Sequence, residues 1–288
     1  MGTSAYSDVR PSPIAGSWYP GNAAELRAVV ESFLERAAAP ALSGEILALV
    51  VPHAGYIYSG FTAAHAFKAL IGSRFSRVIL LSPSHQYYRE PLLTSGHEAY
   101  ATPLGAIPVD REALTALGRL LQAASGPDIT PIRRDREHSL EIELPFLQTV
   151  LPEGFSLVPL MLVSQSVELI HALSDALARY MLPLPPEEKT LLVASSDLSH
   201  FYTEKQARQL DTRVLNALEE MDIDKLYVLN ASGKGQACGM APILTVLRTC
   251  RVLGADKLVI ADYRTSADVT RDLDSVVGYG SAVITKAA

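Results

Sequence analysis

The stretch EILALVVPH, residues 45–53, decides the fold class of this chain. It is apolar over six consecutive positions, without the alternation of a half-exposed strand, and therefore indicates a strand buried on both faces. Strands of that kind belong almost only to parallel sheets covered by helices on both sides. The segment SGFTAAHAFKALIG, residues 59–72, follows with helical spacing and ends in glycine. Residues 45–72 thus predict a buried strand followed by a helix.

The same alternation of apolar runs and helical segments recurs along the chain and predicts a largely parallel sheet. Further strands are expected over residues 77–85, 155–163, 190–200, 256–263 and 276–285. Further helices are expected over residues 110–124, 136–152, 166–181, 203–222 and the second half of 233–254. An excursion with a hairpin is expected over 86–108, and a loosely held N-terminus over 1–9. We therefore predict a single α/β domain over residues 1–288, with a central, largely parallel or mixed sheet flanked by helices.

Composition excludes several classes of protein. The formal net charge is -6 and the basic residues form no run, which argues against nucleic acid as a partner. No apolar stretch approaches the roughly 20 residues of a membrane helix, and the first residues lack the apolar core of a signal peptide. Two cysteines in 288 residues form no disulfide framework. We expect a cytoplasmic protein with no membrane partner.

Polar side chains follow three of the apolar runs at the point where each run ends. VVPH ends in His53, LSPSH ends in His85, and ASSDLSH contains Asp197 and His200. Ligands of open α/β sheets bind beyond the carboxyl ends of the strands, so we expect these side chains to meet at one rim. Imidazole is the commonest biological metal ligand, and two or three of them near a carboxylate suit a divalent transition metal. The sequence therefore predicts a metal site at this rim.

The two cysteines differ in their surroundings. Cys238 stands in GQACGMAP, where a glycine-bearing loop enters a helix. The partial positive charge of a helix N-terminus lowers the pKa of a thiol, which makes Cys238 a candidate thiolate ligand. The alternative is a small packing residue at a helix start. Cys250 lies among apolar residues at helical spacing, and we interpret it as packing.

Five further residues are candidates for a substrate pocket. His138 lies in REHSLEIELPF together with Glu141, near a helix start, and either lines the crevice or supports the helix end. Tyr56 and Tyr87 flank the strand-end histidines, and Trp18 is the only tryptophan. Each of these rings either walls a pocket for a flat substrate or packs in the interior.

Six segments, in this order, resemble the Memo family, also called AmmeMemoRadiSam system protein B. They are RPSPIAGSWYP, PHAGYIYSG, SPSH, EHSLEIELPFL, SSDLSH and ACGMAP. The resemblance extends from about Arg10 to the last strand. It implies a single α/β domain like that of the class III extradiol dioxygenases, which hold non-haem Fe(II) with two histidines and one glutamate.

The resemblance implies that His53, His85 and Cys238 are the metal ligands. Asp197 and His200 would lie beside the metal, as acid–base groups or as supports for the ligands. Cys238 replaces the carboxylate of the dioxygenases, which argues against ring cleavage. Non-haem Fe2+ is the expected metal, with copper and zinc as alternatives because a thiolate also suits Cu(I) and Zn.

These observations predict a metal-dependent oxidoreductase that handles oxygen or a small molecule, with His200, oriented by Asp197, moving a proton. Two alternatives stay open. One is a non-catalytic module that binds a peptide, a phosphotyrosine or a metal in the same crevice, and the other is a catechol-type extradiol dioxygenase. The resemblance also implies a pathway link to a radical-SAM protein and an AMMECR-type protein.

Overall fold

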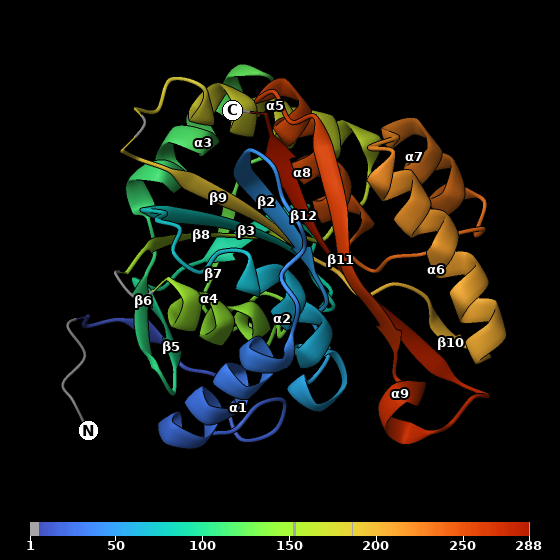
Figure 1. Ribbon diagram of the computed structural model, residues 1–288. Helices are drawn as coiled ribbons and strands as arrows, with labels where there is room; N and C mark the ends of the chain where they lie inside the picture. The colour runs from blue at the N-terminus through green and yellow to red at the C-terminus, as the bar shows by residue number, and fades with distance from the viewer. Residues whose placement is uncertain (1–5, 152–153, 186, 288) are drawn as a thin grey trace.

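The computed structural model describes residues 6–151, 154–185 and 187–287 (Figure 1). Its main sheet has nine strands: β2 (Glu45–Val51), β3 (Arg77–Pro83), β4 (Leu92–Ser95), β7 (Thr130–Ile132), β8 (Ser156–Leu162), β9 (Thr190–Ser195), β10 (His200–Tyr202), β11 (Lys257–Thr265) and β12 (Val276–Lys286). Their order is β10-β12-β2-β9-β3-β8-β4-β7, and β11 pairs with β12 outside this path. The predicted α/β class with a mixed, largely parallel central sheet is confirmed.

The centre of the sheet is parallel and its flanks are antiparallel. β2, β9, β3 and β8 run in one direction, whereas β12 on one side and β4 on the other run against them. All six residues of β9 are buried, as expected for a strand covered on both faces. The consequence for function is that β2, β9 and β3 end next to one another at the same edge of the sheet.

Helices cover both faces of the sheet. They are α1 (Ala23–Arg36), α2 (Phe61–Lys68), α3 (Arg111–Ala123), α4 (Leu144–Val150), α5 (Val167–Met181), α6 (Glu204–Glu219), α7 (Ile223–Ala231), α8 (Met240–Val252) and α9 (Ala267–Thr270). Figure 1 shows α1, α2 and α4 on one face and α3, α5 and α8 on the other. Among the helices of the described residues, none has the length and apolar character required to cross a bilayer.

The helix expected over 136–152 is shorter than predicted, and its residue 152 lies outside the described residues. Only the 3-10 turn η2 (Glu141–Glu143) and α4 are helical. The reason is that the Glu137 carboxylate accepts the backbone N–H groups of His138 and Ser139, which holds this stretch in a loop. The sequence also left α7 unpredicted.

The N-terminal segment is held in place over its described part. Residues 1–5 of the expected loose segment 1–9 lie outside the described residues. Asp8 pairs with Arg133 at 2.7 Å, and β1 (Val9–Arg10) runs parallel to β5 (Ala99–Thr102). β5 forms an antiparallel hairpin with β6 (Gly105–Pro108), which confirms the hairpin predicted in the excursion.

Candidate metal centre

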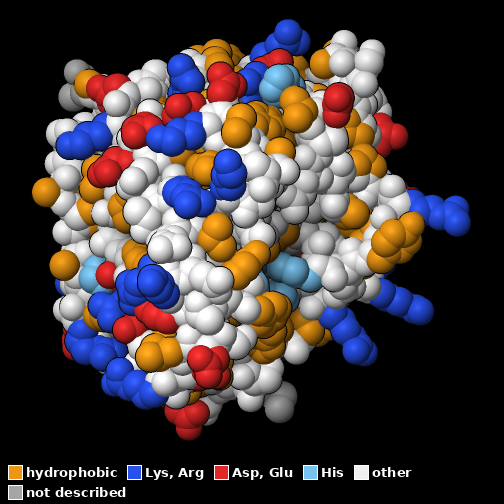
Figure 2. All heavy atoms as spheres, turned by 90° about the vertical axis from the view of Figure 1, so that its right-hand side faces the viewer, with side chains coloured by type: hydrophobic (Ala, Val, Ile, Leu, Met, Phe, Trp, Pro, Cys, Tyr) orange, Lys and Arg blue, Asp and Glu red, His pale blue; other side chains and the backbone are white. Residues whose placement is uncertain are grey.

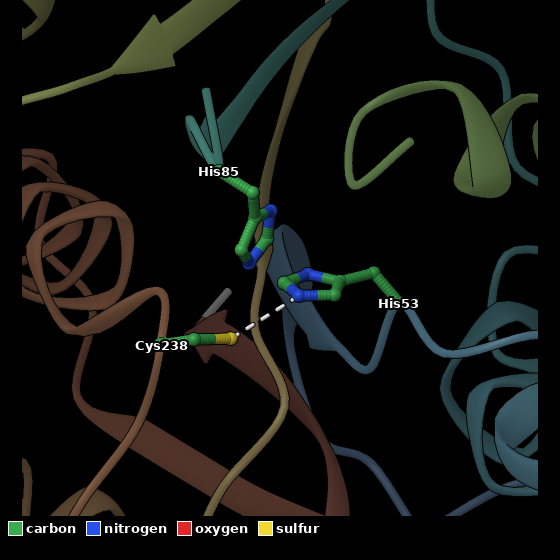
Figure 3. A group of neighbouring side chains, drawn as sticks. All are labelled: His53, His85 and Cys238. Carbon is green, nitrogen blue, oxygen red and sulfur yellow. Dashed lines mark hydrogen bonds between the residues drawn. The ribbon is translucent and has the colours of Figure 1, made fainter. Parts of the chain in front are cut away.

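Two of the three strands that end side by side deliver the two histidines. His53 follows the end of β2 by two residues, and His85 follows the end of β3 by two residues, with β9 between them. Cys238 lies in the loop that leads into α8, two residues before that helix begins. Figure 3 shows the three side chains pointing toward one another, and their ligand atoms all lie within 4.8 Å of one another. The structure therefore brings together the three residues that the sequence identified as ligands.

The geometry of this group suits a transition metal. The Sγ atom of Cys238 lies 3.1 Å from Nε2 of His53 (Figure 3). A nitrogen and a sulfur that share a tetrahedral ion lie about 3.5 Å apart, given bond lengths of about 2.0 and 2.3 Å. Small movements of the side chains would thus admit an ion among two imidazoles and a thiolate. The group can hold a metal, and this set of nitrogen and sulfur donors suits iron, copper and zinc.

A buried carboxylate determines the protonation of Nδ1 of His85. Glu137, 2 % exposed, accepts the backbone N–H of His85 at 2.6 Å and lies 3.0 Å from Nδ1 of the same residue. The hydrogen bond with Glu137 raises the pKa of His85. Burial alone would raise the pKa of Glu137, but the hydrogen bonds from His85 and Ser139 outweigh it and hold that pKa well below its usual range. An ionised Glu137 fixes the proton on Nδ1 and leaves Nε2 of His85 for a metal.

The thiol of Cys238 is held close to the end of β9. The backbone N–H of Asp197 lies 3.3 Å from Sγ, and the backbone N–H of Cys238 donates to the carbonyl of Asp197 at 3.2 Å. Burial raises the pKa of Cys238 to about 12. The predicted lowering by a helix N-terminus was wrong, because desolvation outweighs the helix dipole here. Metal coordination deprotonates a thiol outright, so the site remains chemically suited to a metal.

The prediction that Asp197 orients His200 was wrong, because the side chains of Asp197 and His200 each bond to backbone groups. The carboxylate of Asp197 accepts the backbone N–H of His53 at 2.8 Å, and burial raises its pKa to about 7. Nδ1 of His200 lies 2.8 Å from the carbonyl oxygen of Leu198. A carbonyl only accepts, so Nδ1 carries the proton and Nε2 is the free acceptor. Leu198, not Asp197, therefore orients the His200 ring.

Two of the candidate pocket residues stack on the ligand group. The ring of His138 lies 4.7 Å from that of His85 at 22°, and the ring of Trp18 lies 4.1 Å from that of His138. Burial lowers the pKa of His138 to about 4, so its ring is neutral near pH 7. Trp18 is 36 % exposed and forms the outer layer of this stack. Trp18, the outer of these two rings, can therefore contact a ligand that enters from solvent.

The other three pocket candidates lie elsewhere. Tyr56 is buried in the core and donates its hydroxyl to the carbonyl of Ile142 at 2.9 Å. Glu141 is fully buried, and its carboxylate accepts hydrogen bonds from Arg10, Ser12 and Tyr19. Tyr87 is 91 % exposed, so its ring lies in solvent. Tyr56 and Glu141 therefore stabilise the interior, since their polar groups are already satisfied.

Glu137 belongs to the candidate site, and the sequence did not predict it. The residue directly precedes His138 in the segment EHSLEIE, and a carboxylate next to a candidate histidine is a signal for a group that orients ligands. Only the structure shows that this carboxylate reaches back to His85, 52 positions earlier.

The surface shows where histidine side chains reach solvent. In the view turned by 90°, histidine side chains lie between hydrophobic side chains on the face toward the reader (Figure 2). The exposed aromatic residues of the described chain include Trp18, Tyr58 and Phe201. Phe201 is next to His200 in sequence, and their rings lie 5.6 Å apart. The exposed ring of Phe201 thus borders the rim next to His200.

Comparison with known proteins finds relatives over nearly the whole chain. A family model described as Memo-like protein matches residues 10–283. A MEMO1 family protein of Nitrosopumilus maritimus is 32 % identical over 95 % of this chain and 98 % of its own length. One from Methanococcoides burtonii is 33 % identical over 96 % of this chain and all of its own, and one from Aquifex aeolicus is 32 % identical over 94 % and 97 %.

Proposed function

Because the chain belongs to the Memo-like family, we propose that it is a non-haem metal-binding protein of oxidoreductase type with His53, His85 and Cys238 as ligands. The observation that carries the proposal is the convergence of these three ligand atoms within 4.8 Å. Iron, as Fe2+, is the metal that we propose first, with copper as the alternative. When bound, such an ion supplies one-electron chemistry and polarises oxygen or a small-molecule substrate.

The residues around the proposed ligands accept a proton, hold the substrate and support the ligands. His200 takes up a proton at Nε2, because Leu198 holds the other ring nitrogen in its protonated form. The pKa of His200 is lowered by burial and by the nearby charge of His85, which keeps the ring in its proton-accepting form. Trp18, supported from behind by the His138 ring, holds the substrate against the rim through its outer ring face. Asp197 holds the backbone at His53 in place.

Metal analysis of protein purified without oxygen tests this proposal. The wild type is expected to bind about one iron or copper ion per chain, and His53→Ala and Cys238→Ser to retain less than about a tenth of it. His171→Ala, on the exposed face of α5, and Cys250→Ala, in the interior of α8, are the matched controls and are expected to bind like wild type. Full metal content in the two ligand variants would contradict the ligand assignment.

Trp18 provides an optical readout of the same site. It is the only tryptophan of the chain. Its ring contacts that of His138, which in turn stacks on the proposed ligand His85. Anaerobic addition of Fe2+ is expected to quench most of its fluorescence, whereas Zn2+, whose d shell is filled, is expected to leave the emission largely intact. The His85→Ala variant is the control. Equal quenching in that variant would show that the ion binds elsewhere.

A further inference from the structure

Ser195, the last residue of β9, connects His53 to a buried carboxyl group. Its Oγ atom lies 2.8 Å from Nδ1 of His53, 2.6 Å from the carbonyl oxygen of Ser139 and 3.0 Å from Oε1 of Glu143. Ser195 and Ser139 are 0 % exposed, Glu143 is 1 % exposed and His53 is 2 % exposed. The inner edge of the His53 ring therefore meets a closed cluster of hydrogen bonds and no bulk water.

The number of hydrogens in this cluster determines the tautomer of His53. A serine hydroxyl has one hydrogen to donate and two lone pairs. The Ser139 carbonyl can only accept, and at 2.6 Å it takes that hydrogen or shares it with Glu143. In either case no hydroxyl hydrogen is left for His53, so Nδ1 of His53 donates to Ser195. The unprotonated nitrogen is then Nε2, which faces Cys238.

One short segment anchors both histidines. Glu137 bonds directly to Nδ1 of His85, while the Ser139 carbonyl and Glu143 act on His53 through Ser195. All three anchors lie within residues 137–143, so a single loop and the turn η2 set the orientation of both rings. Such partners of a ligating histidine fix its tautomer and typically contribute 10–100-fold in metal affinity.

We infer that Ser195 and Glu143 are positioning residues, which hold His53 in the tautomer that presents Nε2 beside the Cys238 thiol. The inference rests on the proposed function, because it gives that nitrogen a metal to bind. Neither residue is proposed to touch the metal or a substrate. Their role is to prevent the ring from turning or exchanging its proton position before a metal arrives.

The first test is Zn2+ affinity, measured by competition with a chelator. Ser195→Ala is expected to weaken binding about tenfold or more, whereas Ser195→Thr keeps the hydroxyl and is expected to stay within about threefold of wild type. Glu143→Leu is expected to weaken binding less than Ser195→Ala does, because the Ser139 carbonyl still takes the hydroxyl hydrogen. It is not expected to lower stability, because it replaces a buried carboxyl with an apolar group. Glu143→Gln retains a hydrogen-bonding group and is its conservative counterpart. Urea unfolding of each metal-free variant separates loss of affinity from loss of fold.

The second test is nitrogen NMR of the metal-free protein, which reports which ring nitrogen carries the proton. Wild-type His53 is expected to be protonated at Nδ1, and Ser195→Ala to lose that preference. His85, which is held by Glu137, stays unchanged as an internal control. The inference is overturned if Ser195→Ala keeps either its Zn2+ affinity or the Nδ1-protonated tautomer. A wild type that binds no Zn2+, iron or copper would instead contradict the proposed function. The NMR measurement separates the two failures, because it reports the tautomer of His53 in the metal-free protein.

Discussion

Substitution of Gly239 by alanine is expected to weaken metal binding on the order of 100-fold, although Gly239 is not a ligand. A Cβ atom at this position would lie 2.3 Å from the carbonyl oxygen of Ser195 and 2.7 Å from Cβ of Ser196. Non-bonded heavy atoms need roughly 3.5 Å. The end of β9 is held between β2 and β3. We therefore expect the segment that carries Cys238 to move by about 1 Å to restore an ordinary contact distance. Metal–ligand distances tolerate only about 0.2 Å.

Chelator competition with Zn2+ and with Fe2+ measures this loss. The matched control is Gly118→Ala in α3, where nothing lies within 4 Å of the added Cβ atom. That variant is expected to bind metal like wild type and to be more stable by about 0.5–1 kcal/mol, because alanine favours a helix over glycine. Unchanged affinity in Gly239→Ala would mean that close packing against β9 does not place the thiol.

Substitution of Arg10 by methionine is expected to lower the free energy of unfolding by about 3–5 kcal/mol. Arg10 is 2 % exposed, forms ion pairs with the buried carboxylates of Asp135 and Glu141, and lies 4.8 Å from the centre of the Tyr100 ring. Methionine fills much of the volume but leaves two carboxylates buried without a cation. Such a broken buried pair costs far more than the intact pair contributes.

The loss extends toward the metal centre, because Arg10 also donates to the carbonyl of Glu137 at 2.9 Å. Urea unfolding of the metal-free protein measures the stability term separately from metal binding. Arg208→Met is the control, since the exposed pair of Arg208 with Glu204 is expected to contribute less than about 1 kcal/mol. A change below about 1 kcal/mol in Arg10→Met would contradict the central role of this guanidinium.

The local sequence predicted the strands well because burial leaves a local mark. β2, β3, β8 and β9 each lie within an apolar run that the sequence identified, and the residues that follow these runs include both histidines of the centre. The prediction was weaker where side chains compete with the backbone. The loop at 136–140 has helical periodicity, but Glu137 captures the N–H groups that a helix would need.

The candidate pocket was predicted only in part, for a related reason. Aromatic residues near a histidine have the same sequence signal whether they face solvent, the site or the core. Trp18 stacks at the site, Tyr56 packs in the core and Tyr87 lies in solvent. The pKa of Cys238 was predicted in the wrong direction because its helix start is visible in the sequence, whereas its burial is not.

By itself the sequence determined the α/β class and which residue types end each strand, because hydrophobic periodicity is a property of neighbouring positions. Only the tertiary structure decided that β2, β9 and β3 are neighbours and that Cys238 meets His53 from 185 positions away. It also decided which groups hold the imidazoles: Glu137 for His85, and Ser195 for His53. Hydrogen bonds and desolvation depend on what lies nearby in space, and the chain order alone does not specify that.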